Sequence, residues 1–285
     1  MITSARSLGF SPEAQVRDRS QLAFLSALLR HGADRYILKG GMAMRALYGS
    51  ARLTKDVDFD GTDSISDRSL ATRIPSALEQ AARSAGIVEQ RIDRTKSGEL
   101  ASRWRLAGRT RDGTVLTWEV ELSRRGAPAA GFVETHTIQP PYEYTIAPFV
   151  ARVYSATAMA AAKVNALLSD NRSVPRDVYD LADLVRRSAS PVALWIEHLS
   201  RENLDRKRDA VLPKVTLIDF PLANAELLPY LARDIRATID EKRWGDLQRE
   251  VAEGVSRWFE EAIPKSKAAK DMNRDPYADH DLTGR

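Results

Sequence analysis

An alternating stretch at residues 53–60 constrains the fold of this chain more than any other segment. Its apolar side chains Val57 and Phe59 alternate with three acids, Asp56, Asp58 and Asp60. Successive side chains of a β-strand point to opposite faces of its sheet. The pattern therefore predicts a strand with one buried face and one face that carries carboxylates.

Two of these carboxylates, Asp56 and Asp58, lie two residues apart and are expected on the same side of the strand. Two like charges so close together are unfavourable unless a cation lies between them. Mg²⁺ takes hard oxygen ligands and bridges to substrate phosphates, and Mn²⁺ accepts similar ligands. Two acids on a strand are also typical of a solvated edge, so the pair alone leaves both interpretations open.

A pair of glycines, Gly40 and Gly41, lies between a short apolar run at 36–38 and a short predicted helix at 42–48. Glycine lets the backbone approach a ligand closely, and the N–H groups at a helix start attract anions. A lone Gly-Gly pair is more often a simple turn. Combined with the nearby carboxylates, it predicts a phosphate cradle beside a metal site, as metal-dependent nucleotidyl transfer requires.

A β-hairpin is predicted at 102–122, because an Asp-Gly turn separates two strand-like stretches. In its second stretch, Glu119 and Glu121 lie opposite a row of apolar side chains. Two acids that face solvent are the plain interpretation. Beside the first site, one of them is expected to complete the metal site, and we choose Glu121 with Glu119 as the alternative.

Composition sets broad limits on the protein. The chain has 285 residues, no cysteine and a formal net charge of +4. The length suggests one large or two ordinary domains, and the lack of cysteine excludes disulfides, thiolate metal sites and cysteine nucleophiles. The mild positive charge permits a nucleic-acid partner without requiring one. Neither a membrane-spanning apolar run nor a secretory signal is recognisable, so a cytoplasmic protein with no membrane partner is expected.

The chain changes character after a proline-rich stretch at 140–148. We expect a mixed α/β domain at 1–148, a helical domain at 149–262 and a polar, flexible tail at 263–285. Six arginines surround the predicted hairpin: Arg103, Arg105, Arg109, Arg111, Arg124 and Arg125. A solvated face is their ordinary interpretation, and contact with an RNA backbone is the alternative.

Two runs resemble a known family. The run L-K-G-G-x-A-x-R at 38–45 and the run R-x-T-K-D-V-D-F at 52–59 resemble AbiEii/AbiGii-type nucleotidyltransferases. These are toxins of bacterial toxin–antitoxin and phage-defence systems, they include the MenT-like enzymes, and they belong to the DNA polymerase β-like superfamily. Many superfamily members carry Gly-Ser where this chain has Gly-Gly, so backbone N–H groups must serve here in place of a hydroxyl.

The resemblance continues into the second half of the chain and spans roughly residues 20–190. Residues 121–123 resemble the strand that carries the third acid of the family. Lys163, followed by R-D-x-Y-D-L at 176–181, resembles the more family-specific helical motif. Asp180 within this motif is expected only to stabilise the start of its helix, as acids there commonly do.

The resemblance implies an α+β fold: a polymerase β-like nucleotidyltransferase core, with a mixed sheet and helices on one face, and a helical C-terminal domain that completes the active-site cleft. It implies transfer of a nucleoside monophosphate from an NTP to RNA, with the tRNA 3′ end as acceptor, which stops translation. A cognate antitoxin is the implied partner, and the oligomeric state stays open. Transfer to a protein or small-molecule hydroxyl, or a non-catalytic nucleotide-binding module, are the alternatives.

The resemblance and the residue patterns together define a set of candidate site residues. The expected catalytic residues are Asp56, Asp58, Lys163 and Asp177. The expected nucleotide-binding residues are Lys39, Gly40, Gly41, Arg45, Thr54 and Arg176. The expected metal ligands are Asp56, Asp58 and Glu121.

Overall fold

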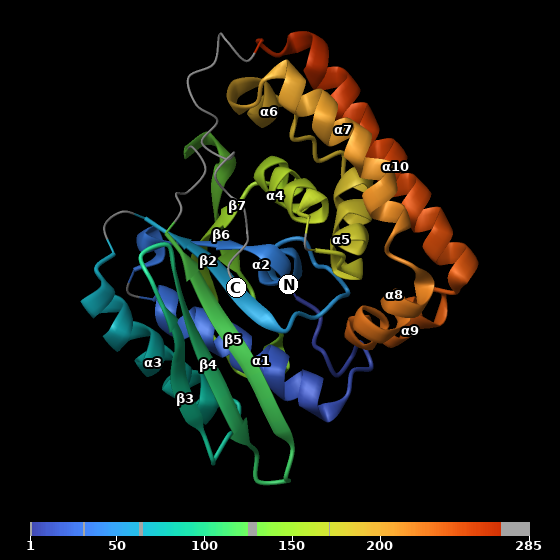
Figure 1. The fold of residues 1–285 in the computed structure, drawn as a ribbon. Helices are drawn as coiled ribbons and strands as arrows, with labels where there is room; N and C mark the ends of the chain where they lie inside the picture. The colour runs from blue at the N-terminus through green and yellow to red at the C-terminus, as the bar shows by residue number, and fades with distance from the viewer. Residues whose placement is uncertain (1, 31, 63–64, 125–129, 171, 269–285) are drawn as a thin grey trace. The chain divides into compact units, whose positions relative to one another are not determined.

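A computed structural model of the chain describes residues 2–30, 32–62, 65–124, 130–170 and 172–268 (Figure 1). The chain forms two compact units. The first, here called the sheet unit, comprises Met1–Tyr154 and Tyr230–Ile235. The second, here called the helical unit, comprises Ser155–Pro229 and the chain from Arg236 onward.

The sheet unit contains a seven-stranded sheet with the order β3-β4-β5-β2-β1-β7-β6. Its strands are β1 (Tyr36–Lys39), β2 (Asp56–Gly61), β3 (Arg91–Ser97), β4 (Ala101–Arg109), β5 (Val115–Ser123), β6 (Val133–Ile138) and β7 (Phe149–Tyr154). The pairs β2–β5 and β1–β7 are parallel, and the other four pairs are antiparallel. The sheet is therefore mixed, as expected from the sequence.

Helices of the sheet unit cover the apolar face of this sheet. They are α1 (Pro12–Leu29), α2 (Gly40–Ala46) and α3 (Asp67–Ser84). Ser11 caps α1 by accepting a hydrogen bond from the backbone N–H of Ala14, and Pro12 occupies the first turn, where its missing N–H costs nothing. Helix α1 packs on α3 and contacts β5.

Aromatic side chains join α1 to the sheet. Phe24 on α1 contacts Phe59 edge-on, with ring centroids 6.4 Å apart, and Trp118 at 5.5 Å. All three side chains are buried, and aromatic pairs in this geometry add to the free energy gained by burial. Since Val57, Phe59 and Trp118 occupy the helix-covered face, the intervening acids of β2 and β5 are left on the opposite face.

Strand β7 corrects an expectation from the sequence. Helical structure was expected from Phe149 onward, but Phe149–Tyr154 forms a strand that pairs in parallel with β1. Phe149, Ala151 and Val153 are buried, whereas Val150 is exposed. This period of two is typical of a strand, and the helix-favouring composition that follows it obscured the short alternation.

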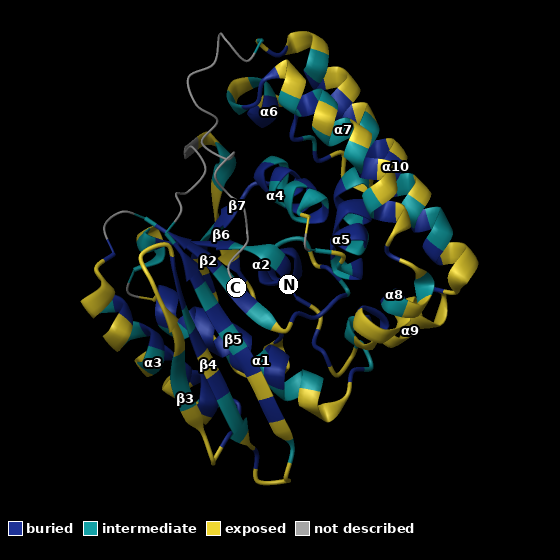
Figure 2. Ribbon diagram, viewed as in Figure 1, coloured by how far each residue is buried: buried dark blue, intermediate teal, exposed yellow. Residues whose placement is uncertain are grey.

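In the described part of the helical unit, six helices lie wholly within it. They are α4 (Ala156–Leu168), α5 (Pro175–Arg186), α6 (Val192–His198), α7 (Arg201–Thr216), α8 (Phe220–Glu226) and α10 (Glu241–Ala262), and the short α9 (Arg233–Ala237) spans the boundary between the units. Helix α10 contacts α5, α6 and α7, and buried and exposed residues alternate along it (Figure 2). Trp195 stacks on Phe259 with ring centroids 4.3 Å apart.

Five short 3₁₀ helices complete the described structure: Ala33–Arg35, Ala130–Phe132, Tyr142–Tyr144, Leu228–Tyr230 and Ile263–Lys265. Of the tail expected at 263–285, residues 269–285 lie outside the described part of the chain. No helix among the described residues is long and apolar enough to cross a membrane.

The segment Tyr230–Ile235 belongs to the sheet unit although it follows most of the helical chain. The backbone N–H of Leu53 donates to the carbonyl of Tyr230 at 2.8 Å, and that of Ala232 donates to Ala51 at 2.9 Å. Leu53 and Ala232 also share a small buried cluster with Phe10. These contacts fix the loop that leads into β2, immediately before its first acid.

Candidate active site

Four carboxylates lie side by side on the face of the sheet opposite α1. In the parallel register of β2 and β5, Asp56 pairs with Glu119 and Asp58 pairs with Glu121. Residues in register on neighbouring strands point to the same face, and the strands lie about 4.8 Å apart. The strand pairing therefore brings together the acids of the alternating stretch and those of the hairpin.

The glycine pair packs directly against the acids of β2. Gly40 has a φ of +66°, and a Cβ built on it would lie 2.5 Å from Oδ2 of Asp58. A Cβ built on Gly41 would lie 2.7 Å from Oγ1 of Thr54 and 2.8 Å from a guanidinium nitrogen of Arg52. Only glycine accommodates both the left-handed backbone and the close carboxylate at position 40. The two sequence motifs therefore form one site in the sheet unit.

The donor set of this site fits a divalent cation. Its ligands would be carboxylate oxygens, which Mg²⁺ and Mn²⁺ prefer, and Asp58 lies in a cradle that a Cβ on Gly40 would fill. Within the described residues, no three Asp, Glu or His side chains are already gathered into a metal-binding group. The carboxylate of Glu121 is directed to an arginine.

Glu121 forms an ion pair with Arg103 on β4. Nε of Arg103 donates to Oε2 of Glu121 at 3.1 Å, and Nη2 donates to the same oxygen. Donating to this carboxylate raises the pKa of Arg103. Glu119 is bound in the same way by Arg105, at 2.7 Å. Both candidates for the third metal ligand are thus held by arginines of the neighbouring strand.

The arginines around the hairpin do not form an unopposed basic surface. Besides the two pairs above, Arg109 pairs with Glu89, and Arg124 pairs with Asp67 at 2.8 Å. Arg125 lies outside the described residues. Since most of these charges are balanced by acids, contact with an RNA backbone would require them to exchange partners.

The other expected nucleotide-binding residues of the sheet unit differ in their surroundings. Thr54 is buried and its hydroxyl donates to the carbonyl of Asp56 at 3.1 Å. Lys39 forms an ion pair with the buried Asp60 and keeps a side chain that is 27% exposed. Asp60 also accepts a hydrogen bond from Tyr154. Thr54 and Lys39 therefore support the strand that carries the acids, and Lys39 keeps partial access to solvent.

Arg45, another residue expected to bind nucleotide, lies buried in the sheet unit. Its side chain is 2% exposed and forms an ion pair with Asp18, which is equally buried, at 3.0 Å. Nη2 also donates to the carbonyl of Thr3 at 2.6 Å. The guanidinium thus links α2 to α1 and to the N-terminal segment. A buried charge requires such partners.

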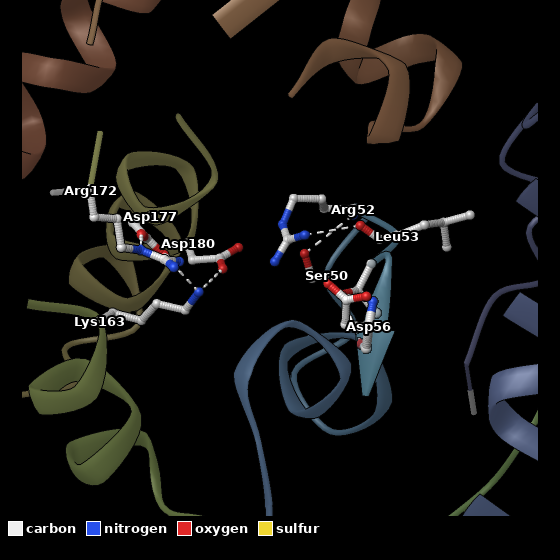
Figure 3. A network of polar contacts seen from close by, with 9 residues as sticks. Ser50, Arg52, Leu53, Asp56, Lys163, Arg172, Asp177 and Asp180 are labelled. Atoms are coloured by element: carbon white, nitrogen blue, oxygen red, sulfur yellow. Dashed lines mark hydrogen bonds and ion pairs between the residues drawn. The ribbon is translucent and has the colours of Figure 1, made fainter. Parts of the chain in front are cut away.

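In the helical unit, the family-specific motif forms a buried cluster of charges (Figure 3). Nζ of Lys163 on α4 lies 3.1 Å from Oδ1 of Asp177 and 2.6 Å from Oδ2 of Asp180. Nε of Arg172 lies 2.7 Å from Oδ2 of Asp177. Burial pushes the pKa of Asp177 upward, but Lys163 and Arg172 outweigh it and hold this pKa below its ordinary value.

Two residues of this cluster were missed or misjudged from the sequence. Asp180 was expected only to stabilise a helix start, but its side chain is fully buried against Lys163. No sequence pattern indicates Arg172, because it lies in a loop with no periodicity to show its direction. Arg176, the remaining candidate, is half-buried, and its guanidinium has no partner among the residues that the structure describes.

Arg52 is another residue that sequence reasoning passed over, although it stands in the quoted motif. It is buried, and its Nη1 donates to the carbonyl of Leu53 at 2.9 Å. Its backbone N–H donates to the hydroxyl of Ser50 at 3.2 Å (Figure 3). Its position against Gly41 places a cation beside the glycine pair.

Comparison with protein-family models gives a match over residues 23–268, to the family described as nucleotidyl transferase AbiEii toxin, type IV toxin–antitoxin system. The chain belongs to the AbiEii toxin family. It is therefore a nucleotidyltransferase of a toxin family, as the sequence motifs implied, and this family implies a cognate antitoxin. Comparison with curated proteins gives no significant match.

Solved structures from Helicobacter pylori share the fold of this AbiEii family member. JHP933 from Helicobacter pylori is 19% identical, with a TM-score of 0.57, and the match covers 90% of this chain and 96% of that one. MenT4, a nucleotidyltransferase toxin from Mycobacterium tuberculosis, is 18% identical, with a TM-score of 0.43, and the match covers 93% and 86%. The likeness to JHP933 extends over both units of the chain and concerns the fold alone.

Proposed function

We propose that this toxin transfers a nucleoside monophosphate from an NTP to RNA, and that the acceptor is the 3′-terminal hydroxyl of tRNA. The transfer forms a bond between the acceptor oxygen and the α-phosphorus, breaks the bond to pyrophosphate and releases the hydroxyl proton. A tRNA extended in this way cannot be aminoacylated, so translation stops. The reaction is proposed to take place in the cytoplasm, where tRNA is found.

The observation that carries the proposal is the close packing of Asp58 against Gly40, beside the in-register acid Glu121. Asp56, Asp58 and Glu121 would hold Mg²⁺, or alternatively Mn²⁺, which when bound screens the triphosphate charge and lowers the pKa of the attacking hydroxyl. The glycine at position 40 allows a phosphate to approach the backbone N–H groups that follow it.

Lys39 and Thr54 are proposed to support nucleotide binding in the sheet unit. Lys39 lies in register with Asp58 on the neighbouring strand, so its partly exposed ammonium adds positive charge on the same face of the sheet. Thr54 packs against Gly41 and orients the glycine backbone.

In the helical unit we propose Lys163 and Asp177 as catalytic residues and Arg176 as a phosphate-binding residue. The family-specific motif supports these assignments. Asp177 accepts hydrogen bonds from both Lys163 and Arg172, which fixes the ammonium of Lys163. Because the cluster balances two cations with two carboxylates, it is rigid and holds no excess charge. Arg176 keeps its five donors for an anion.

The test is a transfer assay with total tRNA, Mg²⁺ and each α-labelled NTP in turn. The purified wild type is compared with Asp56→Asn and Asp58→Asn. Label is expected on tRNA with the wild type, and at least about a hundredfold less with either variant, because the charge stabilisation that they remove is worth several kcal/mol. The labelled NTP identifies the base that is transferred.

Asp93→Asn is the matched control for this assay. It removes a carboxylate from the same face of the sheet on β3, where Asp93 lies in register with Arg105 and two strands, β4 and β5, separate it from β2. Transfer to tRNA is expected to persist in this variant. Label on protein or on a small hydroxylated molecule, with none on RNA, would replace the acceptor that we propose. No labelled product with any NTP would overturn the proposal as a whole.

A further inference from the structure

One row of side chains crosses the open face of the sheet from the proposed metal site to its edge. Following the registers outward, Asp58 on β2 is next to Glu121 on β5, which is next to Arg103 on β4 and then Lys96 on β3. From β2 outward, this row therefore consists of two acids followed by two bases. Glu121 is therefore the acid of this row that adjoins its first base, Arg103.

Glu121 has two possible partners and is engaged with only one of them in this structure. Its Oε2 accepts two hydrogen bonds from Arg103, whereas its strand neighbour on the other side, Asp58, is also a carboxylate. The side chain is 33% exposed, so rotation about its own bonds is not blocked by close packing. A carboxylate in this position can face the arginine or a cation held by Asp58, and each partner competes with the other.

We propose that Arg103 is a positioning residue that holds Glu121 away from the proposed metal site and releases it when a divalent cation binds. This inference rests on the proposed function, because it assumes that Asp56 and Asp58 hold the cation. Arg103 thereby sets the cation concentration at which Glu121 becomes the third carboxylate ligand. The site is then open to cation and triphosphate before it becomes fully ligated.

The size of the effect follows from the exposure of the pair. The side chain of Arg103 is 41% exposed and that of Glu121 is 33% exposed. An ion pair of this exposure contributes up to about 1 kcal/mol, which is about fivefold in a dissociation constant. Removing Arg103 should therefore tighten cation binding by about three- to fivefold.

The parallel pair on the same two strands supplies a matched control. Arg105 binds Glu119 at 2.7 Å and is similarly exposed, at 50%. Arg105→Gln removes the same charge from the same strand and face, but the carboxylate that loses its closest partner is Glu119, the neighbour of Asp56. Glu119 keeps only a longer contact of 3.6 Å to Arg103. If Glu121 is the third ligand, this variant should leave the cation affinity within about twofold of the wild type.

The experiment is a double-mutant cycle read by Mn²⁺ binding in the absence of nucleotide, with free Mn²⁺ followed by its electron paramagnetic resonance signal. The variants are Arg103→Gln, Glu121→Gln and the double variant. Arg103→Gln is expected to bind Mn²⁺ about three- to fivefold more tightly than wild type, and Glu121→Gln more weakly. In the Glu121→Gln background, Arg103→Gln should change the affinity by less than twofold, because position 121 has no carboxylate left to release and the 3.6 Å contact of Arg103 with Glu119 is weaker than the one that Arg105 makes.

The outcomes separate this inference from the proposed function. If Arg103→Gln tightens Mn²⁺ binding equally in the wild type and in Glu121→Gln, the arginine acts only through long-range electrostatic repulsion of the cation. The positioning role is then refuted. The role is also refuted if Arg103→Gln has no effect, or if only Arg105→Gln tightens binding. If Asp58→Asn leaves Mn²⁺ binding of the protein unchanged, the metal site of the proposed function has failed. Thermal unfolding of each variant verifies that the sheet is intact.

Discussion

The ammonium of Lys163 lies 2.6 Å from a carboxylate oxygen of Asp180, and the side chain of Asp180 is completely shielded from solvent. An ion pair so deeply buried must be fully satisfied, since an uncompensated charge in the interior is strongly destabilising. The cluster is completed by Asp177 and Arg172. Its members are therefore expected to respond to substitution as a group.

The first prediction concerns coupling within this cluster. Lys163→Met leaves two buried carboxylates with one arginine, and should lower the free energy of unfolding by about 3 kcal/mol or more. Combined with Asp180→Asn, the loss should be smaller than the sum of the two single losses, by about 1–3 kcal/mol. Urea unfolding of the four proteins measures the coupling. Additive losses would show that the two residues do not depend on one another.

The second prediction is a pH dependence set by Asp177. Its folded-state pKa is lowered, so its contribution to stability is complete above the ordinary carboxyl pKa of about 4 and is lost as the pH falls through the folded-state value. Asp177→Asn should therefore be less stable than wild type at pH 7, and the difference should shrink below about pH 4.

The control for this prediction is Asp170→Asn, which changes an exposed carboxylate of the same unit. Its free energy of unfolding should stay within about 0.5 kcal/mol of wild type. Denaturant unfolding at pH 7, 5, 4 and 3 provides the comparison. A difference between Asp177→Asn and wild type that is constant over this range would contradict the assigned charge interaction.

The third prediction compares two glycines with nearly the same backbone. Gly40 has a φ of +66° and Gly49 a φ of +64°, but only at position 40 would a Cβ meet Asp58. Alanine at either position should cost about 1–2 kcal/mol of stability. Gly40→Ala should in addition reduce nucleotidyl transfer by at least about tenfold, because it displaces the carboxylate, whereas Gly49→Ala should keep kcat/KM within about twofold. Equal loss of activity in both variants would mean that backbone strain alone is responsible.

The fourth prediction tests the structural place of Arg45. Arg45→Met leaves the carboxylate of Asp18 buried with one fewer cation, and should cost about 3–5 kcal/mol of stability. Steady-state kinetics well below the melting temperature should give an unchanged KM for the NTP. A KM raised more than about fivefold in protein that remains folded would instead favour the nucleotide-binding role that the sequence suggested.

The sequence allowed the architecture around the acids to be predicted, because local patterns determine it. The alternation of Val57 and Phe59 with acids specifies a strand and its buried face, and Glu119 and Glu121 follow from the same rule. The parallel register that joins the two strands is not a local property. It depends on long-range pairing, so the strand pattern left Glu121 and Glu119 as alternatives and could not specify which of them lies beside Asp58.

Other features escaped sequence reasoning for identifiable reasons. Arg45 stands at a motif position near the glycines, and its burial against Asp18 depends on where α1 packs. Asp180 lies close to a helix start, where acids have an ordinary role, so its burial against Lys163 was not indicated. Arg103 gave no sign that it pairs with Glu121, since cross-strand partners follow from register alone.

The hydrogen bonds from residues 51–53 to residues 230–232 have a consequence for synthesis of the protein. A ribosome adds about 5–20 residues per second, so the loop before Asp56 waits roughly 10–35 s for its backbone partners. Until then, the nascent chain contains the acids of β2 but lacks the segment that fixes the loop leading into this strand. The ribosome must therefore synthesise most of the chain before the loop beside Asp56 can form its backbone hydrogen bonds. Only then is the site complete with which this toxin is proposed to stop translation.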